Sequence, residues 1–198
     1  MTLTTPIQTE KTYYTPQEYL ELEKKSEIKN EYLNGEIIPM AGGTTNHNQI
    51  AGNFYRAFPL NINNRDYYTY INDVKLWIQD YGMYTYPDLM IIEDQPSYQS
   101  DNTTVVINPK IIIEVLSDST QNYDRTDKFR AYRSLASFQE YILISQSSYY
   151  IEQFSKQNNE QWLFKSIEGE NNILSLITID FSISLSNLYQ RIVFPTDS

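Results

Sequence analysis

Hydrophobic residues occur in short runs along this chain, and the two most apolar runs each contain or adjoin a carboxylate. Residues 111–116 read Ile-Ile-Ile-Glu-Val-Leu, so Glu114 interrupts a β-branched stretch that predicts a strand buried on both faces. Residues 84–92 predict another apolar strand, with Asp88 at its mouth. An ionised carboxylate in such surroundings is costly unless a cation or hydrogen-bond donors compensate it. These two residues are therefore where we look for chemistry.

Turn and capping residues mark the elements near the N-terminus. The tetrapeptide Thr15–Glu18, with proline at its second position, fits a capping box that begins a helix running toward Lys29. Asn34-Gly35 predicts a type I′ turn in a hairpin over residues 31–38. Asn46 is the expected N-cap of a second helix. Its buried face is marked by apolar residues spaced four apart: Ile50, Phe54 and Phe58.

The rest of the chain alternates between strands and short helices. Residues 67–78 have strand composition, residues 93–104 are a polar loop, and residues 124–135 predict a helix. Further strands are expected in the C-terminal third, separated by polar turns: 141–145, 149–154, 162–167 and 173–176. A short closing helix is expected over residues 185–192.

This pattern predicts an α/β fold with a mixed, largely antiparallel β-sheet flanked by helices. A length of 198 residues suits a single domain with a sizeable core. We expect residues 1–12 to form a loose N-terminal tail and residues 13–194 to form the domain.

Composition narrows the chemistry. The chain has no cysteine, which excludes thiol nucleophiles and thiolate-bound metals, and its single histidine, His47, excludes a poly-histidine metal site. A metal would need mainly oxygen ligands, which suit Mg²⁺ or Mn²⁺. No apolar run approaches the ~20 residues of a membrane span and the first residues form no signal peptide, so we expect a soluble, cytoplasmic protein without a membrane partner.

The net charge of −10 argues against a broad, non-specific nucleic-acid surface. Nucleic-acid binding would need a local basic patch or a bridging cation. The best patch in the sequence comprises three arginines and a lysine: Arg125, Arg130, Arg133 and Lys110. The alternative is that these residues are ordinary solvated charges.

Asp88 and Glu114 are placed to form a divalent-metal site if their strands are neighbours, because both carboxylates have few other partners in their apolar surroundings. The alternative is structural: Asp88 as a turn residue after Pro87, and Glu114 paired with an arginine. Lys128 can aim an ammonium at the same place. Its own alternative is an ion pair with Asp124, four residues earlier on the helix.

Three further residues are weaker candidates. Glu31, before the predicted hairpin turn, is a possible additional ligand or water-orienting base, with Glu36 as its competitor. His47 follows the Gly42-Gly43 loop, which can approach a substrate closely, although a capping histidine is the plainer reading. These assignments depend on where the fold places each side chain.

A proline-aspartate, then a glutamate in a buried strand, then a basic residue together resemble the Uma-two family of predicted restriction endonucleases, in the PD-(D/E)XK nuclease superfamily. The resemblance spans roughly residues 15–185. The matching segments are Glu31–Ile37, His47 with its helix, Tyr86–Asp88, Ile113–Ser117, Asp118–Thr120, Asp124–Arg125 through Lys128 and Tyr132, and Glu140–Tyr141.

The resemblance implies a restriction-endonuclease-like domain with an acidic metal site at one edge of its sheet. It implies that Asp88 and Glu114 are the two superfamily carboxylates, that Mg²⁺ or Mn²⁺ is the cofactor, and that DNA is the substrate. Leu116 stands where the usual Glu-x-Lys pattern has lysine, so Lys128 is the implied substitute. Glu31 matches a glutamate that some relatives use as a further ligand.

We therefore expect a Mg²⁺-dependent endonuclease that hydrolyses DNA, with Asp88, Glu114, Lys128 and Glu31 as its catalytic residues. His47 and Arg125 are the expected substrate contacts. A homodimer is expected because duplex cleavers often act in pairs. The alternative is a catalytically silent protein of the same fold that binds DNA or protein.

Overall fold

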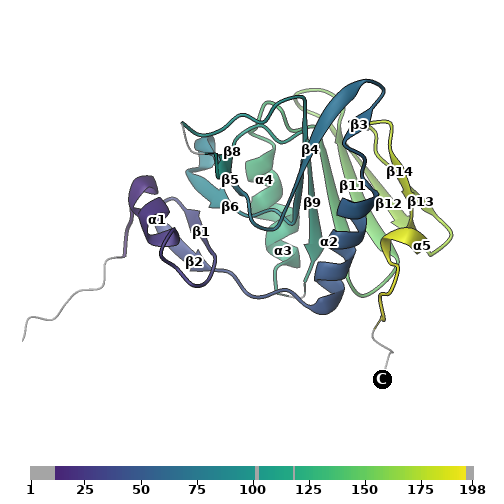
Figure 1. Cartoon of the computed structure of the whole chain (residues 1–198), viewed down its shortest axis with the longest axis horizontal. Helices are drawn as coiled ribbons and strands as arrows, with labels where there is room; N and C mark the ends of the chain where they lie inside the picture. The colour runs from purple at the N-terminus through teal and green to yellow at the C-terminus, as the bar shows by residue number, and fades with distance from the viewer. Residues whose placement is uncertain (1–11, 101–102, 118, 195–198) are drawn as a thin grey trace, which may run out of the picture.

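The computed structural model describes residues 12–100, 103–117 and 119–194 (Figure 1). Two of the sequence predictions concern residues outside these ranges. They are the loose tail, of which residues 1–11 are not described, and Asp118 in the family pattern.

A seven-stranded sheet forms the centre of the fold, in the order β12-β11-β10-β9-β7-β4-β3. Its strands are β3 Asn61–Ile62, β4 Arg65–Ile71, β7 Leu89–Glu93, β9 Ile111–Leu116, β10 Glu140–Ser145, β11 Tyr150–Lys156 and β12 Trp162–Glu168. Strand β9 pairs in parallel with β10 and antiparallel with β7. All six residues of β9 are buried, which confirms the prediction of a strand covered on both faces.

The remaining strands form a five-stranded sheet, β2-β1-β6-β5-β8, and a separate hairpin. The five are β1 Asn30–Leu33, β2 Glu36–Pro39, β5 Lys75–Ile78, β6 Met83–Thr85 and β8 Val105–Val106, and the hairpin joins β13 Ile173–Ser175 to β14 Ser182–Ser184. Among the strand pairs of the described residues, only β9–β10 and β5–β8 are parallel. The α/β class with largely antiparallel strands is thus confirmed.

The strands nevertheless divide into several sheets where one sheet was expected, and the division falls within residues 67–78. Asn72 adopts a left-handed backbone conformation with φ 58° and ends β4. Its amide donates to the carbonyl of Asp88, and the chain then enters β5 in the other sheet. An asparagine tolerates this conformation better than most residues do.

The helices are short. They are α1 Pro16–Glu23, α2 Thr45–Ala57, the 3₁₀ turn η1 Gln79–Tyr81, α3 Gln121–Tyr123, the π-helical turn η2 Asp124–Lys128, α4 Phe129–Tyr132 and α5 Leu185–Leu188. The predicted capping box at Thr15 is present, and Asn34 and Gly35 both have the positive φ that a type I′ turn needs. Helix α2 is capped by Thr44 rather than by Asn46, because the Thr44 hydroxyl accepts from the His47 amide.

The helix predicted for residues 124–135 begins at residue 121 and ends at residue 132. It starts earlier because the Ser117 hydroxyl accepts from the Thr120 amide and holds a turn ahead of the helix. Its middle is the π-helical turn η2, a rare element that is frequent at functional sites. Both ends of η2, Asp124 and Lys128, are buried.

Helices cover both faces of the central sheet. Apolar residues of α2, including Ile50 and Phe54, pack with Ile111, Ile113 and Val115 of β9. On the opposite face Ile112 and Leu116 pack with the α4 segment and the five-stranded sheet. Fully burying one isoleucine or leucine contributes about 1.5–3 kcal/mol. The apolar residues of β9 therefore offset the cost of carrying Glu114 in the same strand.

A third, smaller cluster attaches α1 to the five-stranded sheet. The ring of Tyr19 stacks with those of Tyr32 and Tyr84 at 5.2 and 5.1 Å between centroids, and the rings of Tyr32 and Tyr84 are tilted against each other at 5.8 Å. In Figure 1 this part, with α1, β1 and β2, lies to one side of the central sheet. Among the helices in the described ranges, none is long and apolar enough to cross a membrane.

Candidate active site

Asp88 and Glu114 lie at adjoining strand ends. Asp88 immediately precedes β7, and the β7–β9 register, with Leu89 opposite Ile113, brings it across from Glu114. The Asp88 amide donates to Glu114 Oε2 at 3.0 Å, and the Val115 amide donates to Asp88 Oδ2 at 2.7 Å. Each carboxylate therefore bonds the backbone of the other strand, which brings both acids to one point.

From the sequence, we expect this point at an open edge of the sheet. It does not lie there, because β7 and β9 are central strands. It lies where β7 begins, opposite the C-terminal half of β9. A fully paired central strand has no free lateral edge, so only its ends can be reached by other residues and by substrate. Ligands of open α/β sheets commonly bind at strand ends for the same reason.

Glu114 is 3% exposed and receives several donors. The Tyr132 hydroxyl donates to Oε1 at 2.7 Å, and Lys128 Nζ lies 3.3 Å from the same oxygen. Burial, with the nearby charges of Asp88 and Asp124, raises the pKa of Glu114 to about 8, although Lys128 and Tyr132 act in the opposite direction. Glu114 is therefore a carboxyl group whose negative charge is incompletely compensated by the protein.

Lys128 is 6% exposed and lies among three carboxylates. Its Nζ is 3.1 Å from Asp124 Oδ1, 3.3 Å from Glu114 Oε1 and 3.5 Å from Glu31 Oε1. Burial lowers the pKa of Lys128, but the three carboxylates outweigh it and raise that pKa well above its ordinary value. Lys128 therefore makes both contacts that the sequence suggested: its ammonium reaches Glu114 and also pairs with Asp124 on its own helix.

Glu31 reaches this cluster from β1, where it is 6% exposed. It accepts a short hydrogen bond from the Thr85 hydroxyl of β6 in addition to its contact with Lys128. Glu36, its competitor in the sequence, is exposed at the start of β2. The hairpin thus places Glu31 beside Lys128, which also contacts Glu114, and leaves Glu36 exposed.

His47 approaches from the first turn of α2. Its Nε2 lies 2.9 Å from Asp88 Oδ2. A Cβ at Gly43 would lie 3.0 Å from His47 Nδ1, so a glycine there gives the ring its space. Burial lowers the pKa of His47, but the hydrogen bond to Asp88 and the charges of Asp88, Glu114 and Asp124 raise it above its ordinary value. The imidazole therefore donates a hydrogen bond from Nε2 to the Asp88 carboxylate.

The arginines expected to contact substrate already have partners. Arg125 Nε and Nη2 both donate to the Glu152 carboxylate, at 2.9–3.2 Å. Arg130 faces Asp127, and Lys110 pairs with Glu93 at 2.7 Å. The guanidinium of Arg133 lies over the ring of Phe129. A phosphate would have to displace Glu152 to reach Arg125.

Asp124 is the site residue that the sequence analysis undervalued. It is 2% exposed, and its Oδ1 touches Lys128 without hydrogen-bond geometry and has no other donor among the described residues. Its spacing of four residues from Lys128 was visible in the sequence. Its burial was not, because that depends on helix 121–132 packing on β9.

The donor chemistry suits a hard divalent cation. Carboxylate oxygens gather around Asp88 and Glu114, and the raised pKa of Glu114 indicates negative charge that the protein does not fully balance. Within the described ranges, no three Asp, Glu, His or Cys side chains converge as a preformed metal cluster. Mg²⁺ commonly takes one or two carboxylates and completes its shell with water and phosphate oxygens. The pair of acids fits that mode of binding.

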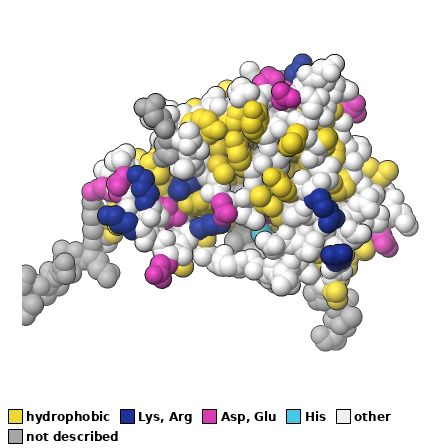
Figure 2. All heavy atoms as spheres, in the orientation of Figure 1, with side chains coloured by type: hydrophobic (Ala, Val, Ile, Leu, Met, Phe, Trp, Pro, Cys, Tyr) yellow, Lys and Arg dark blue, Asp and Glu magenta, His cyan; other side chains and the backbone are white. Residues whose placement is uncertain are grey.

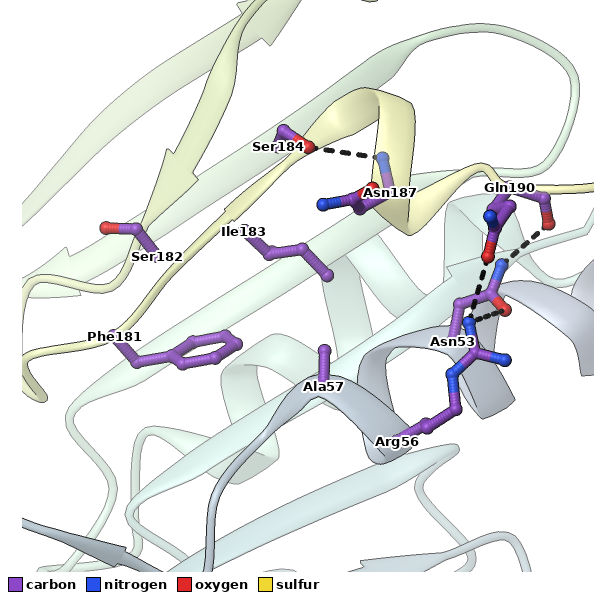
Figure 3. A pocket seen from close by; sticks show the side chains of 9 residues that line it. All are labelled: Asn53, Arg56, Ala57, Phe181, Ser182, Ile183, Ser184, Asn187 and Gln190. Carbon is purple, nitrogen blue, oxygen red and sulfur yellow. Dashed lines mark hydrogen bonds between the residues drawn. The ribbon is translucent and has the colours of Figure 1, made fainter.

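A separate cavity of about 390 Å³ lies between α2 and the C-terminal segment (Figure 3). Its polar side chains mainly tie these elements together: Asn53 donates to the carbonyls of Leu188 and Gln190, and Arg56 donates to the Gln190 side chain. It shares no residue with the Asp88–Glu114 site. These contacts indicate that the residues around the cavity hold α2 against the C-terminal segment.

Comparison with known families agrees with this arrangement. The family Uma2, described as "Putative restriction endonuclease", matches residues 16–186. The chain belongs to the Uma2 family. This is the Uma-two family that the sequence motifs resemble, so that recognition is confirmed, and the matched region contains all of the site residues above.

Two cyanobacterial relatives from Synechocystis sp. (strain ATCC 27184 / PCC 6803 / Kazusa) are similar over most of their length. The uncharacterized protein sll1609 is 41% identical over 157 residues, covering 79% of this chain and 89% of its own. The uncharacterized protein slr1290 is 32% identical over 180 residues, covering 91% and 93%. The similarity to these two proteins thus extends across most of the chain.

A solved structure shares the fold. It is the crystal structure of "a putative nuclease belonging to DUF820" from Anabaena variabilis ATCC 29413, with a TM-score of 0.69 and 16% identity. The alignment covers 91% of this chain and 99% of that one. This likeness shows that the chain shares the fold of that protein.

Proposed function

We propose that this Uma2 protein is a divalent-metal-dependent endonuclease that hydrolyses DNA phosphodiester bonds. The observation that carries the proposal is the reciprocal bonding of Asp88 and Glu114, with Lys128 3.3 Å from Glu114. Two acids and an ammonium at one strand end are the groups that phosphodiester hydrolysis needs. The family match and the nuclease-like fold support the same reaction class.

Asp88 and Glu114 are the residues that would hold Mg²⁺ or Mn²⁺. A divalent ion bound there supplies an activated water and stabilises negative charge on the phosphate in the transition state. The protein's own part is to fix the two carboxylates. The amides of Asp88 and Val115 do this, because each holds the opposite acid by a hydrogen bond.

Lys128 orients the attacking water or neutralises charge that develops on the phosphate. Glu31 and Asp124 hold its ammonium within 3.5 Å, so it stays charged in a buried position. His47, held against Asp88, is the substrate-facing donor of the site. Arg125 is a second phosphate contact only when Glu152 releases it.

The proposal also includes a homodimeric assembly and a location in the cytoplasm. Cleavage of both strands of a duplex favours a homodimer, because each chain offers one Asp88–Glu114 site. A chain with no cysteine suits the reducing cytoplasm, where DNA is accessible. Light scattering on the purified protein tests the dimer directly.

A catalytically silent DNA- or protein-binding module is the second candidate. The observation that favours it is the occupancy of the site by its own side chains, since Lys128 already lies among three carboxylates and Arg125 is paired. In such a protein the acids and the lysine serve only stability.

Plasmid nicking with and without Mg²⁺ separates the two candidates. The wild type should nick supercoiled DNA in Mg²⁺ or Mn²⁺ and should stop in a chelator. Asp88→Asn should lower the rate by at least roughly 100-fold, because it removes a charged ligand. Calorimetric titration with Mg²⁺ should show binding that the same variant loses. Wild-type protein that neither cleaves DNA nor binds the ion would support the silent module.

A further inference from the structure

Two lysines flank a tyrosine next to the proposed catalytic aspartate. Lys75 Nζ lies 5.1 Å and Lys29 Nζ lies 5.7 Å from the centre of the Tyr86 ring. Tyr86 is buried and comes two residues before Asp88 in the chain. Both ammonium groups therefore lie beside the same buried ring.

Backbone contacts tie this pair to the Asp88–Glu114 site. Lys29 Nζ donates to the carbonyl of Asn72 at 3.1 Å, and the Asn72 amide donates to the carbonyl of Asp88 at 3.0 Å. Lys29 also comes two residues before Glu31, which contacts Lys128. Lys29 thus lies one asparagine away from the aspartate and just before β1, which carries Glu31, whereas Lys75 is the first residue of β5.

The charges of this pair are the least compensated among the basic groups near the site. Lys75 is half-buried and makes no ion pair with any residue in the described ranges. Burial lowers the pKa of Lys75 and outweighs the opposing charge of Glu23, whose carboxylate accepts a hydrogen bond from the Tyr86 hydroxyl. Lys29 has one partner, Asp73, whose side chain is 79% exposed. An exposed ion pair of this kind is weak and screened, so another anion can take the place of Asp73.

The other candidate cations contrast with this pair. Arg125 and Lys110 are held by partly buried glutamates, and Arg133 is stacked on Phe129. In Figure 2 basic side chains gather over the part of the molecule that contains α1 and β1, with acidic side chains between them. Among the cations named above, Lys29 and Lys75 are thus the two that no buried or stacked partner holds.

We propose that Lys29 and Lys75 together bind a backbone phosphate of the DNA that neighbours the phosphate at Asp88 and Glu114. This rests on the proposed nuclease function and adds the contact by which so acidic a protein holds DNA. Lysine contacts to phosphate position the duplex without reading its sequence. The binding they provide is therefore independent of sequence and sensitive to salt.

Fluorescence anisotropy with a labelled duplex tests the proposal without relying on cleavage. Binding is measured across a salt series in Ca²⁺, for the wild type and for Lys29→Gln/Lys75→Gln, which keeps most of each aliphatic stem. The double variant should bind roughly tenfold more weakly, and its log–log salt slope should be shallower by about 0.9, because one phosphate contact is lost. Lys29→Arg/Lys75→Arg should restore both values.

Two further variants complete the design. Lys165→Ala removes an exposed lysine on the edge strand β12 and should leave the affinity and the slope unchanged. Asp73→Asn removes the exposed competitor of the phosphate and should tighten binding about threefold or more. This variant removes only an exposed side chain, so it tests the proposal even if the glutamine variant folds poorly.

The outcomes distinguish this proposal from the function on which it rests. Wild-type protein that cleaves DNA, with glutamine and Asp73 variants that bind like wild type, overturns the lysine pair and leaves the nuclease standing. Protein that neither binds nor cleaves DNA overturns both. A shallower slope in the glutamine variant together with tighter binding by Asp73→Asn supports the pair.

Discussion

The ammonium of Lys128 lies 3.3 Å from Oε1 of Glu114, and the same oxygen accepts the Tyr132 hydroxyl at 2.7 Å. Lys128 and Tyr132 are one helical turn apart, on a helix whose preceding turn, η2, is π-helical. One carboxylate oxygen in the central strand is thus held by two donors from one helix. This relationship couples the stability of the helix to the charge of the site.

Lys128→Met should destabilise the protein and stop cleavage. It removes the only cation that contacts Glu31, Glu114 and Asp124 together among the described residues, and breaking a buried ion pair on one side costs about 3–5 kcal/mol. Urea denaturation gives the stability, and plasmid nicking well below the melting temperature gives the activity.

Mg²⁺ separates the two effects of this substitution. A divalent ion should restore part of the lost stability, because it replaces the missing positive charge, but it should not restore the rate. A Lys128→Met protein that cleaves as fast as wild type would show that Lys128 is only the structural partner of Asp124. Asp124→Asn is the matched control, since it removes one carboxylate and leaves the lysine.

Tyr132→Phe should cost about 1–3 kcal/mol of stability, because Glu114 loses a buried hydrogen-bond donor. The hydroxyl lowers the pKa of Glu114, so its removal should raise that pKa further. Tyr19→Phe, which removes a hydroxyl bonded to a backbone carbonyl far from Glu114 in the sequence, is the comparison for stability alone. Equal pH dependence of stability in the two variants would contradict a role for Tyr132 in the charge of the site.

The single histidine makes one ionisation directly observable. The contact with Asp88 should place the pKa of His47 above 6.5 in metal-free protein, as measured from the pH dependence of its ring signals by NMR. Because the folded value is raised, the stability that this contact adds is complete below pH 6.5 and is lost as pH rises through the folded pKa. Asp88→Asn should lower that pKa; a value unchanged in this variant would mean that Asp88 does not hold the ring.

The strands that carry Asp88 and Glu114 could be predicted because both are short apolar runs. The carboxylate in or beside each run stood out because a buried charge needs a partner. The sequence also predicted the caps and turns whose chemistry is local, such as Thr15 and Asn34-Gly35. Hydrophobic periodicity and helix capping depend on residues that are neighbours in the sequence, so both can be recognised without knowing the fold.

The parts that were wrong or missed depend on contacts between distant residues. The break at Asn72 is tied to the carbonyl of Asp88, sixteen positions later, and no local signal shows it. Arg125 looked available for substrate, but Glu152 of β11 holds it. Asp124 looked like a surface partner of Lys128, but packing of the helix on β9 buries it. Sequence patterns identify which side chains could take part in a reaction. Tertiary packing decides which of those side chains remain available to a substrate.

The pH dependence of stability should report the charge of Glu114. Its pKa is about 8 in the folded chain and near 4.5 in the unfolded chain, so between these values the unfolded chain releases a proton that the folded chain keeps. In a chelator the free energy of unfolding should therefore fall as pH rises from about 4.5 to about 8, by at most about 1.4 kcal/mol per pH unit for this group. Urea titrations at intervals across this range measure the fall.

Three comparisons assign that fall to Glu114. Glu114→Gln cannot ionise and should flatten the curve, whereas His47→Gln should remove only the smaller part that His47 contributes in the same direction. Mg²⁺ should flatten the wild-type curve as well, because a cation beside Asp88 and Glu114 favours the ionised carboxylate. If the wild-type curve is steep, and Mg²⁺ stabilises the protein equally at pH 5 and pH 8, the ion does not bind at Glu114 and the metal site must be sought elsewhere.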